Sequence, residues 1–281
     1  MFIKIKEIHS DIKNIFSKKY LLFSQKLIFF YSYVLIIFNR FFDGRFLNVK
    51  KQRFLSFVIE FDDFSDFYWT FREIFLEDNY YFDSEKESPC IIDCGGNIGM
   101  SVLYFKYLYP GAHIKVFEAL PENAEILQRN ITNNNLVDVE IITKAVGAEE
   151  GEIEMFGDKR AATISKGMTD THDKSNMKKS IKVCVVKLSS YITKEVDFLK
   201  IDIEGAEGQV IEELSESNVL QKIRRITMEY HSISGETNLL SGIVSSLEKA
   251  KFKISFVSDV SRVIDLNARS FSHIMLVALK K

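Results

Sequence analysis

The sequence predicts an α/β protein with a mostly parallel sheet, preceded by an N-terminal helical extension. Three observations predict this fold. From residue 90 onward, short apolar runs alternate with helical stretches, which is typical of parallel strands joined by crossover helices. The first of these runs leads into a glycine-rich turn that opens a helix. The last run, Ile274 to Leu279, is expected to pair antiparallel beside Ile254 to Val257.

Length and composition are those of a soluble, folded protein. The 281 residues are 46% hydrophobic and 27% charged, close to globular averages. Lys and Arg number 37 against 39 Asp and Glu, so the basic field that holds a phosphate backbone is missing and we expect no nucleic-acid partner. Cys90 and Cys94 flank one short strand, too far apart for a disulfide. We therefore expect three reduced, buried cysteines and a cytoplasmic location.

An N-terminal helical extension is expected over residues 1–56. Its apolar segment, Leu27 to Phe38, has 12 residues, whereas a membrane-spanning helix needs about 20. No small-residue cleavage site follows it. A helix that is apolar nearly all round must bury itself against the main body, a second copy of the chain or a membrane surface. Packing or dimerisation is favoured over membrane association, because apolar helices of this length are more often buried.

The chain after this extension begins with one expected strand and one expected helix. The run Arg53 to Phe61 predicts the strand, and the two acids after it turn the chain into the aromatic helical stretch Phe64 to Glu77. Asp66 lies in the first turn of this helix, where its charge suits the positive end of the helix dipole.

Alternating elements follow in the order that a parallel sheet requires. The expected strands cover 90–93, 114–117, 139–145, 151–156, 181–188, 196–203, 223–230, 254–257 and 274–279. The expected helices end near residues 109, 133, 214 and 251. The polar stretch 157–180 is longer than usual loops, so it is either a mobile lid or contains a short strand near 161–165. Its lysines, at 159, 174, 178 and 179, could attract an anionic substrate, although a solvated loop is favoured.

The segment from Ile91 to Gly99 carries the clearest chemical signal. It reads I-I-D-C-G-G-N-I-G, a strand ending in an acid and a turn whose glycines let a ligand approach the backbone. The helix behind the turn offers free N–H groups to a carboxylate or phosphate. Asn97 breaks the dinucleotide pattern G-x-G-x-x-G, which disfavours a nicotinamide dehydrogenase. The spacing D-x-G-x-x-x-G from Asp93 suits S-adenosylmethionine better.

A second acid, Glu118, ends the next apolar strand. A carboxylate at the carboxyl edge of a parallel sheet can accept hydrogen bonds from both hydroxyls of a ribose. Glu118 could also be an exposed acid at a strand end without a ligand. Its spacing from the glycine-rich turn favours the interpretation that it binds a ribose.

These residues and several later motifs resemble the FkbM family of S-adenosylmethionine-dependent methyltransferases. The motifs are F-E-A-L-P-E-N at 117–123, Asn130, A-V-G at 145–147 and, most strongly, K-I-D-I-E-G-A-E at 200–207. The resemblance defines a predicted domain over residues 57–281 and implies a class I, Rossmann-like methyltransferase fold. It also implies methylation of a hydroxyl, typically on a sugar of a glycoconjugate or on a polyketide-like product. Ala119 replaces the usual proline, and Ser189 replaces an aspartate, which puts any role of that aspartate in doubt.

The turn and the resemblance together give a set of expected cofactor-binding residues. They are Asp93, Gly95, Gly96, Asn97, Gly99, Glu118, Ala145, Asp202 and Glu204. Three aromatic side chains at 80–82 could cover the adenine, although core packing is favoured for them.

The expected chemistry lies where two neighbouring strands end. Side chains alternate along a strand, so Lys200 and Asp202 share one face, and Glu229 and His231 share a face of the next strand. His231 is the expected catalytic base, because an imidazole titrates near neutral pH, and Glu229 is expected to orient its ring. Asp202, the third catalytic candidate, would hold the methionine amino group. No metal site is predicted. The alternative that Asp202, Glu229 and His231 together bind a divalent cation stays open. Lys200 needs a charged partner.

The predicted activity is O-methyl transfer from S-adenosylmethionine to a hydroxyl of a carbohydrate or another small molecule. Two alternatives stay open: a non-catalytic module that keeps the fold, and an N-methyltransferase. Enzymes that methylate planar nitrogens often carry Asn- or Asp-Pro-Pro-aromatic where this chain has D-I-E-G at 202–205, so the second alternative is disfavoured. For partners other than the substrate, two alternatives stay open: residues 27–38 could form a homodimer, or they could contact a membrane surface.

Overall fold

The computed structural model describes residues 5–42, 48–158, 161–163, 180–232, 239–257 and 272–280. The chain divides into two compact units. The first contains Met1–Asp83, Ile98–Leu108 and Glu125–Val137, and the second contains Ser84–Asn97, Tyr109–Ala124 and Asp138–Lys281. The predicted boundary between residues 56 and 57 falls between two strands of the first unit and stays a prediction.

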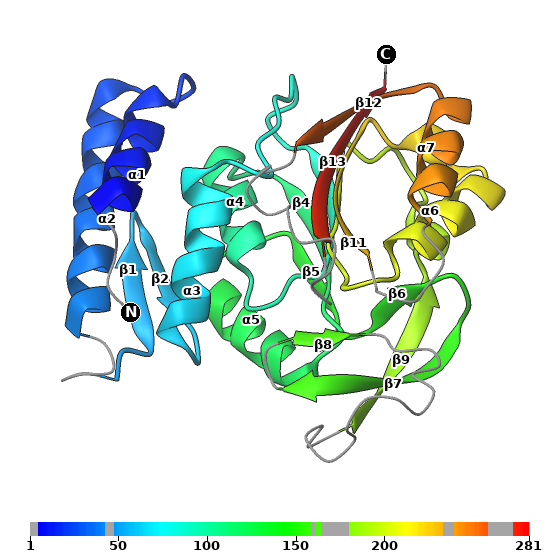
Figure 1. Ribbon diagram of the computed structural model, residues 1–281, viewed down its shortest axis with the longest axis horizontal. Helices are drawn as coiled ribbons and strands as arrows, with labels where there is room; N and C mark the ends of the chain where they lie inside the picture. Colours follow the sequence, from blue (N-terminus) through cyan, green and yellow to red (C-terminus); the bar gives the residue numbers. More distant parts are fainter. Residues whose placement is uncertain are drawn as a thin grey trace. The chain divides into compact units, whose positions relative to one another are not determined.

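The first unit is mainly helical (Figure 1). Its elements are α1 (Ile5–Ser17), α2 (Phe23–Phe42), β1 (Lys51–Phe54), β2 (Phe57–Glu60), α3 (Phe64–Phe71), the π-helix η1 (Arg72–Leu76), α4 (Met100–Leu108) and most of α5 (Pro121–Asn133). The single strand expected over 53–61 is wrong. Leu55 adopts a left-handed φ of 52°, and the chain folds back into the antiparallel hairpin β1–β2. Asp63 caps α3, because its side chain accepts the N–H groups of Ser65 and Asp66, and Asp66 lies in the first turn as expected.

Helix α2 contains the apolar segment 27–38. One face of it is buried within the first unit through Phe29, Tyr33 and Ile36, as packing on the body of the protein predicts. The opposite face is exposed. Among the residues that the structure describes, no helix is long and apolar enough to cross a membrane.

Asn130 of α5 and Asn134, the residue just after this helix, pair with the backbone of β2. Asn134 accepts from the N–H of Val58 at 2.7 Å and donates to its carbonyl at 2.9 Å, and Asn130 pairs with Glu60 in the same way at 2.7 and 3.0 Å. One helical turn and two strand residues have similar lengths, so the two amides take the place of a neighbouring strand. Asn130 also donates to the carbonyl of Ile98 at 2.8 Å, which fixes the last part of the glycine-rich turn.

The second unit is built on a seven-stranded sheet of order β12-β13-β11-β10-β3-β4-β5. The strands are β3 (Cys90–Cys94), β4 (His113–Phe117), β5 (Val139–Ile142), β10 (Phe198–Ile201), β11 (Arg225–Ser232), β12 (Phe252–Val257) and β13 (Ser272–Lys280). β13 runs antiparallel to both of its neighbours, and the remaining pairs are parallel. This confirms the mostly parallel sheet with an antiparallel strand near the C-terminus.

Two helices cover one face of this sheet (Figure 1). Helix α6 (Glu207–Glu216) and helix α7 (Leu240–Lys249) contribute Leu214 and Leu247 to the same buried core as Leu199 of β10. Two short 3-10 helices complete this part, η2 (Leu188–Tyr191) and η3 (Val219–Lys222). Because this core holds β10 and β11 against each other, their carboxyl ends are fixed side by side.

A smaller four-stranded sheet of order β6-β9-β7-β8 also belongs to the second unit (Figure 1). Its strands are β6 (Ala145–Gly147), β7 (Gly151–Asp158), β8 (Ala161–Thr163) and β9 (Ser180–Lys187). The single strand expected over 139–145 is wrong, because the chain turns at Lys144, whose N–H donates to the carbonyl of Ile142, and β5 and β6 join different sheets. β8 supplies the short strand considered near 161–165. The lysines at 159, 174, 178 and 179 lie outside the described residues.

The cysteines are all free. Cys94 is buried, Cys90 is half-buried and Cys184 is exposed. The expected burial of all three is therefore wrong for Cys184, which lies on β9 of the smaller sheet.

Candidate active site

β3 ends in a tight turn whose backbone lies against the end of β10. Gly95 has a φ of 91°, and a Cβ added there would lie 1.8 Å from the carbonyl oxygen of Asp202. No other residue fits this position without moving the strand end. The N–H groups of Gly95 and Gly96 both donate to the carbonyl of Phe117 at 2.9 Å. The turn is therefore fixed to the ends of β4 and β10.

Glu118 follows β4 and holds the same turn through its carboxylate. Its Oε2 accepts from the N–H of Asn97 at 2.7 Å, and its Oε1 accepts from the N–H of Leu120 at 2.9 Å. Burial raises the pKa of Glu118, and the two backbone hydrogen bonds oppose that shift. Each carboxylate oxygen can accept a second hydrogen bond, so both can also receive a ligand's hydroxyl groups.

A cavity of about 670 Å³, counting its part open to solvent, lies at these turns. Six of the expected cofactor residues line it: Gly95, Asn97, Glu118, Ala145, Asp202 and Glu204. Asn123, the last residue of the motif at 117–123, also lines the cavity, together with Lys144 and Met155, which the sequence analysis did not single out. Met155 comes from β7, so the smaller sheet forms part of the wall.

Three expected cofactor residues do not line this cavity. Asp93 is fully buried, and its Oδ1 lies 3.2 Å from the Nζ of Lys200. Gly96 contributes its backbone N–H to the turn, and Gly99, with a φ of 91°, packs against Leu127 of the first unit. The structure thus places Asp93 as a support for Lys200 rather than in contact with a ligand in the cavity.

Lys200 is buried at the junction of β3 and β10. Its Nζ lies 2.8 Å from the carbonyl of Gly95 and 3.5 Å from Oδ2 of Asp202, besides its contact with Asp93. Burial lowers the pKa of Lys200, but the charges of Asp93 and Asp202 outweigh it and the net shift is upward. The expected charged partner is confirmed, and the ammonium ties the turn to the strand end that lines the cavity.

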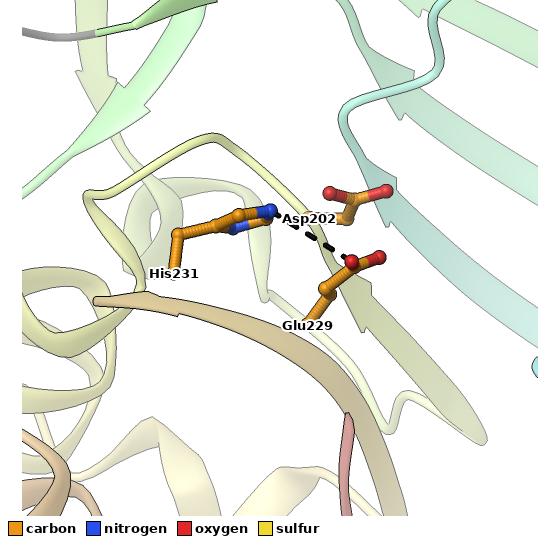
Figure 2. Close-up of side chains that lie close together, drawn as sticks. All are labelled: Asp202, Glu229 and His231. Atoms are coloured by element: carbon orange, nitrogen blue, oxygen red, sulfur yellow. Dashed lines mark ion pairs between the residues drawn. The ribbon is translucent and has the colours of Figure 1, made fainter. Parts of the chain in front are cut away.

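Asp202, Glu229 and His231 gather at the carboxyl ends of β10 and β11, as the alternation of side chains predicts (Figure 2). One ligand atom from each lies within 4.8 Å of the others. The Nε2 of His231 is 3.8 Å from Oε1 of Glu229 and 3.7 Å from Oε2 of Glu204. Asp202 and Glu204 line the cavity, so the cluster adjoins it. Two carboxylates and an imidazole are a set of ligand atoms that could hold a divalent cation.

Glu207 is a site residue to which the sequence analysis assigned no role. It is fully buried, and its Oε1 accepts from Nδ1 of His231 at 2.8 Å and from the N–H of Gly205 at 3.1 Å. It therefore orients the imidazole and also fixes the loop after β10. Glu229, expected to orient the ring, lies near the other ring nitrogen. The only signal for Glu207 was its place as the last letter of K-I-D-I-E-G-A-E.

The groups around His231 raise the pKa of its imidazole above the ordinary value. Burial lowers its pKa, but the hydrogen bond and charge of Glu207, with the charges of Glu204 and Asp202, raise it to about 9. The expected pKa near neutrality is therefore wrong. The pKa of Asp202 is also raised, by burial and by the charge of Glu229, although Lys200 opposes that shift.

Two other sequence features have a structural explanation. The rings of Tyr80 and Phe82 pack near Phe105, and Tyr81 stacks on Tyr20 with ring centroids 4.7 Å apart, as core packing predicts. Ser189, which stands where the resembled family has an aspartate, donates its hydroxyl to Glu213 of α6. It thus joins η2 to that helix.

A family model described as the methyltransferase FkbM domain matches residues 93–262. Two curated relatives are methyltransferases. "Methyltransferase 1" of Beauveria bassiana is 28% identical over 173 residues, which cover 52% of this chain and 67% of that protein. Methyltransferase sdnD of Sordaria araneosa is 25% identical over 195 residues, which cover 59% of this chain and 75% of that protein.

Solved structures also resemble the chain. Methyltransferase FkbM from Methylobacillus flagellatus KT is 16% identical with a TM-score of 0.49, and the match covers 74% of this chain. This chain spans about half of that protein, 47% of its length. TYW2 of M. jannaschii, solved in complex with AdoMet, is 14% identical with a TM-score of 0.44, over 81% of this chain and 84% of that one.

The hydrogen bond between Glu207 and His231 gives a first prediction. In the Glu207→Gln variant we expect the pKa of His231 to fall from about 9 toward the ordinary value of 6.5, because a neutral amide stabilises the imidazolium less. The stabilisation that the charged ring gives is complete below pH 6.5 and is lost as the pH rises through about 9. Nuclear magnetic resonance titration of the His231 ring measures the shift.

Glu212→Gln is the matched control for this titration, because Glu212 is an exposed acid on the same helix. The Glu212→Gln variant should leave the pKa of His231 unchanged. An unchanged pKa in Glu207→Gln would contradict the role assigned to Glu207.

Proposed function

This chain belongs to the FkbM family of S-adenosylmethionine-dependent methyltransferases, and from that premise we propose that it methylates a hydroxyl of a carbohydrate. The fold is the class I methyltransferase fold, with the antiparallel strand β13 between β11 and β12. One observation carries the proposal. A single cavity is lined by both Glu118 and Asp202, and the cluster of Glu229 and His231 lies beside Asp202.

The residues around the cavity fit S-adenosylmethionine. Glu118, held by two backbone N–H groups, would accept the ribose hydroxyls, and Asp202 would accept the methionine amino group. The carboxyl group of the methionine part is matched by Lys144 on the same wall, and Met155 offers an apolar surface to the adenine. When bound, S-adenosylmethionine supplies a methyl group already activated by its sulfonium.

His231 is the proposed catalytic base. Nδ1 of His231 is held by Glu207, so the other ring nitrogen, Nε2, would take the proton of the acceptor hydroxyl when the methyl group passes to that oxygen and the demethylated cofactor leaves. Because its pKa is about 9, most rings must first lose a proton at neutral pH. Asp202 is the second candidate for this step. Positioning of the hydroxyl by the cluster supplies most of the remaining catalysis.

A hydroxyl acceptor suits the loop after β10 better than a planar nitrogen does. The loop reads D-I-E-G at 202–205 and presents Asp202 and Glu204 to the cavity. Carboxylates are acceptors only, so they pair with the many hydroxyl donors that a sugar carries. The alternative of a non-catalytic module differs from this proposal in one measurable respect, because it would bind S-adenosylmethionine without turnover.

Removal of the Glu118 carboxylate tests the cofactor site. We expect Glu118→Ala to weaken S-adenosylmethionine binding by about 10- to 100-fold, because two hydrogen bonds are lost and water replaces them in part. Isothermal titration calorimetry measures the change. Glu122→Ala is the control, because Glu122 is an exposed acid in the first turn of α5. This variant should bind S-adenosylmethionine with the affinity of the unaltered chain. Equal affinity of the Glu118→Ala variant would refute the ribose role.

Methyl incorporation tests the reaction. Labelled S-adenosylmethionine is incubated with glycan and lipid extracts, and we expect label in a carbohydrate as a methyl ether. The rate should rise with pH toward about 9, because the neutral imidazole is the active form. His231→Ala should lower turnover by about 10²- to 10⁴-fold and keep cofactor affinity.

Three outcomes of this experiment would count against the proposal. Label on nitrogen would support the N-methyltransferase alternative. Binding of the cofactor without incorporation into any extract would support the non-catalytic module. Full activity of His231→Ala would remove His231 as the base.

A further inference from the structure

Helix α2 carries a continuous stripe of exposed apolar side chains, which we name the α2 stripe. Its six members are 44 to 67% exposed: Phe23, Leu27, Tyr31, Val34, Phe38 and Phe41. Successive members are three or four residues apart, so all six lie on one face of the helix. The helix has 20 residues and is therefore about 30 Å long. An exposed apolar patch that runs the length of a helix marks an interaction surface.

The stripe cannot turn inward, because the opposite face of α2 is already packed. Phe29, Tyr33 and Ile36 are buried, and the hydroxyl of Tyr33 donates to Oδ2 of Asp11 at 2.9 Å. The ring of Phe29 also contacts Phe54 of β1 edge-on, with centroids 4.9 Å apart. One side of α2 is thus fixed in the first unit, and only its outer side is available to a partner.

Helix α1, which packs against α2, carries exposed positive charge. The two helices lie side by side (Figure 1), and the ring of Phe16 contacts Phe23 at 6.4 Å between centroids. Lys6 and Lys13 lie two turns apart on the exposed face of α1, and Lys19 is exposed just after its end. The acids do not balance these charges. Asp11 is buried and paired with Arg72 at 2.8 Å, which leaves Glu7 as the other acid of α1.

We propose that the α2 stripe and the α1 lysines bind the surface of an anionic lipid bilayer, with α2 lying along the plane of the interface. Charge complementarity decides between this partner and a second copy of the chain. Two copies that met stripe to stripe would bring their own lysines together, whereas anionic headgroups neutralise them. Lysine stems extend along apolar surface while their ammonium groups reach the headgroups. The ring and hydroxyl of Tyr31 suit the same boundary.

Vesicle flotation with the full chain tests the proposal. We expect the chain to float with vesicles of phosphatidylcholine and phosphatidylserine, and to stay behind with vesicles of phosphatidylcholine alone. The triple variant Leu27→Ser, Tyr31→Ser and Phe38→Ser should lower the partition coefficient by about 10- to 100-fold, because three apolar side chains no longer leave water. The loss should be similar in Lys6→Gln, Lys13→Gln and Lys19→Gln.

Two control variants match these changes elsewhere on the surface. Val137→Ser removes an apolar side chain that is 67% exposed but lies outside α2, and it should float normally. The triple change Lys249→Gln, Lys251→Gln and Lys253→Gln removes three exposed lysines of the second unit, and it too should float normally. Every variant is first checked for the thermal shift that S-adenosylmethionine gives to the unaltered chain, which reports an intact fold.

Specific outcomes would overturn the proposal. If the chain floated with neither kind of vesicle, it would not bind a lipid surface. Flotation of the α2 stripe variant at the level of the unaltered chain would assign binding to another surface. Light scattering could also show that the unaltered chain is a dimer and that the α2 stripe variant is a monomer. If the chain then did not float with vesicles, a second copy of the chain would be the partner. Should the stripe variant fail to fold, the charge variant of α1 decides the question alone.

Discussion

The buried ammonium of Lys200 is the interaction on which the rest of the site depends. A charge this deeply buried is costly unless it is paired, and here it reaches Asp93, Asp202 and the carbonyl of Gly95 together. Those partners belong to β3, the glycine-rich turn and the end of β10. One cation thus fixes the three segments that line or support the cavity, and the absence of a side chain at Gly95 lets them approach so closely.

The same region concentrates negative charge, and that excess determines how the other groups titrate. Asp202, Glu204, Glu207 and Glu229 lie near a single imidazole, so His231 holds its proton well above neutral pH. A site of this kind favours ligands that carry positive charge or many hydrogen-bond donors. S-adenosylmethionine brings a sulfonium and an ammonium, and a sugar brings hydroxyls. The electrostatics of the cluster are therefore consistent with the proposed pair of substrates.

The sequence was sufficient to predict what depends on local pattern. Alternation along β10 and β11 correctly placed Asp202, Glu229 and His231 together, and the glycine spacing located the turn at Gly95. Features that depend on tertiary contacts could not be predicted. Glu207 acts through a hydrogen bond to a residue 24 positions away, and the pKa of His231 reflects charges from several segments. Strands were expected over 151–156 and 181–188, but their separate sheet was not, because the chain turn at Lys144 interrupts an apolar run without glycine or proline.

The most direct test of the account is a crystal structure of the chain with S-adenosylhomocysteine, the demethylated form of the cofactor. We expect the ribose hydroxyls to lie within hydrogen-bond distance of the Glu118 carboxylate, and the sulfur to face the side of the cavity formed by Asp202 and Glu204. A ligand bound outside this cavity, or bound in it with the ribose away from Glu118, would contradict the account.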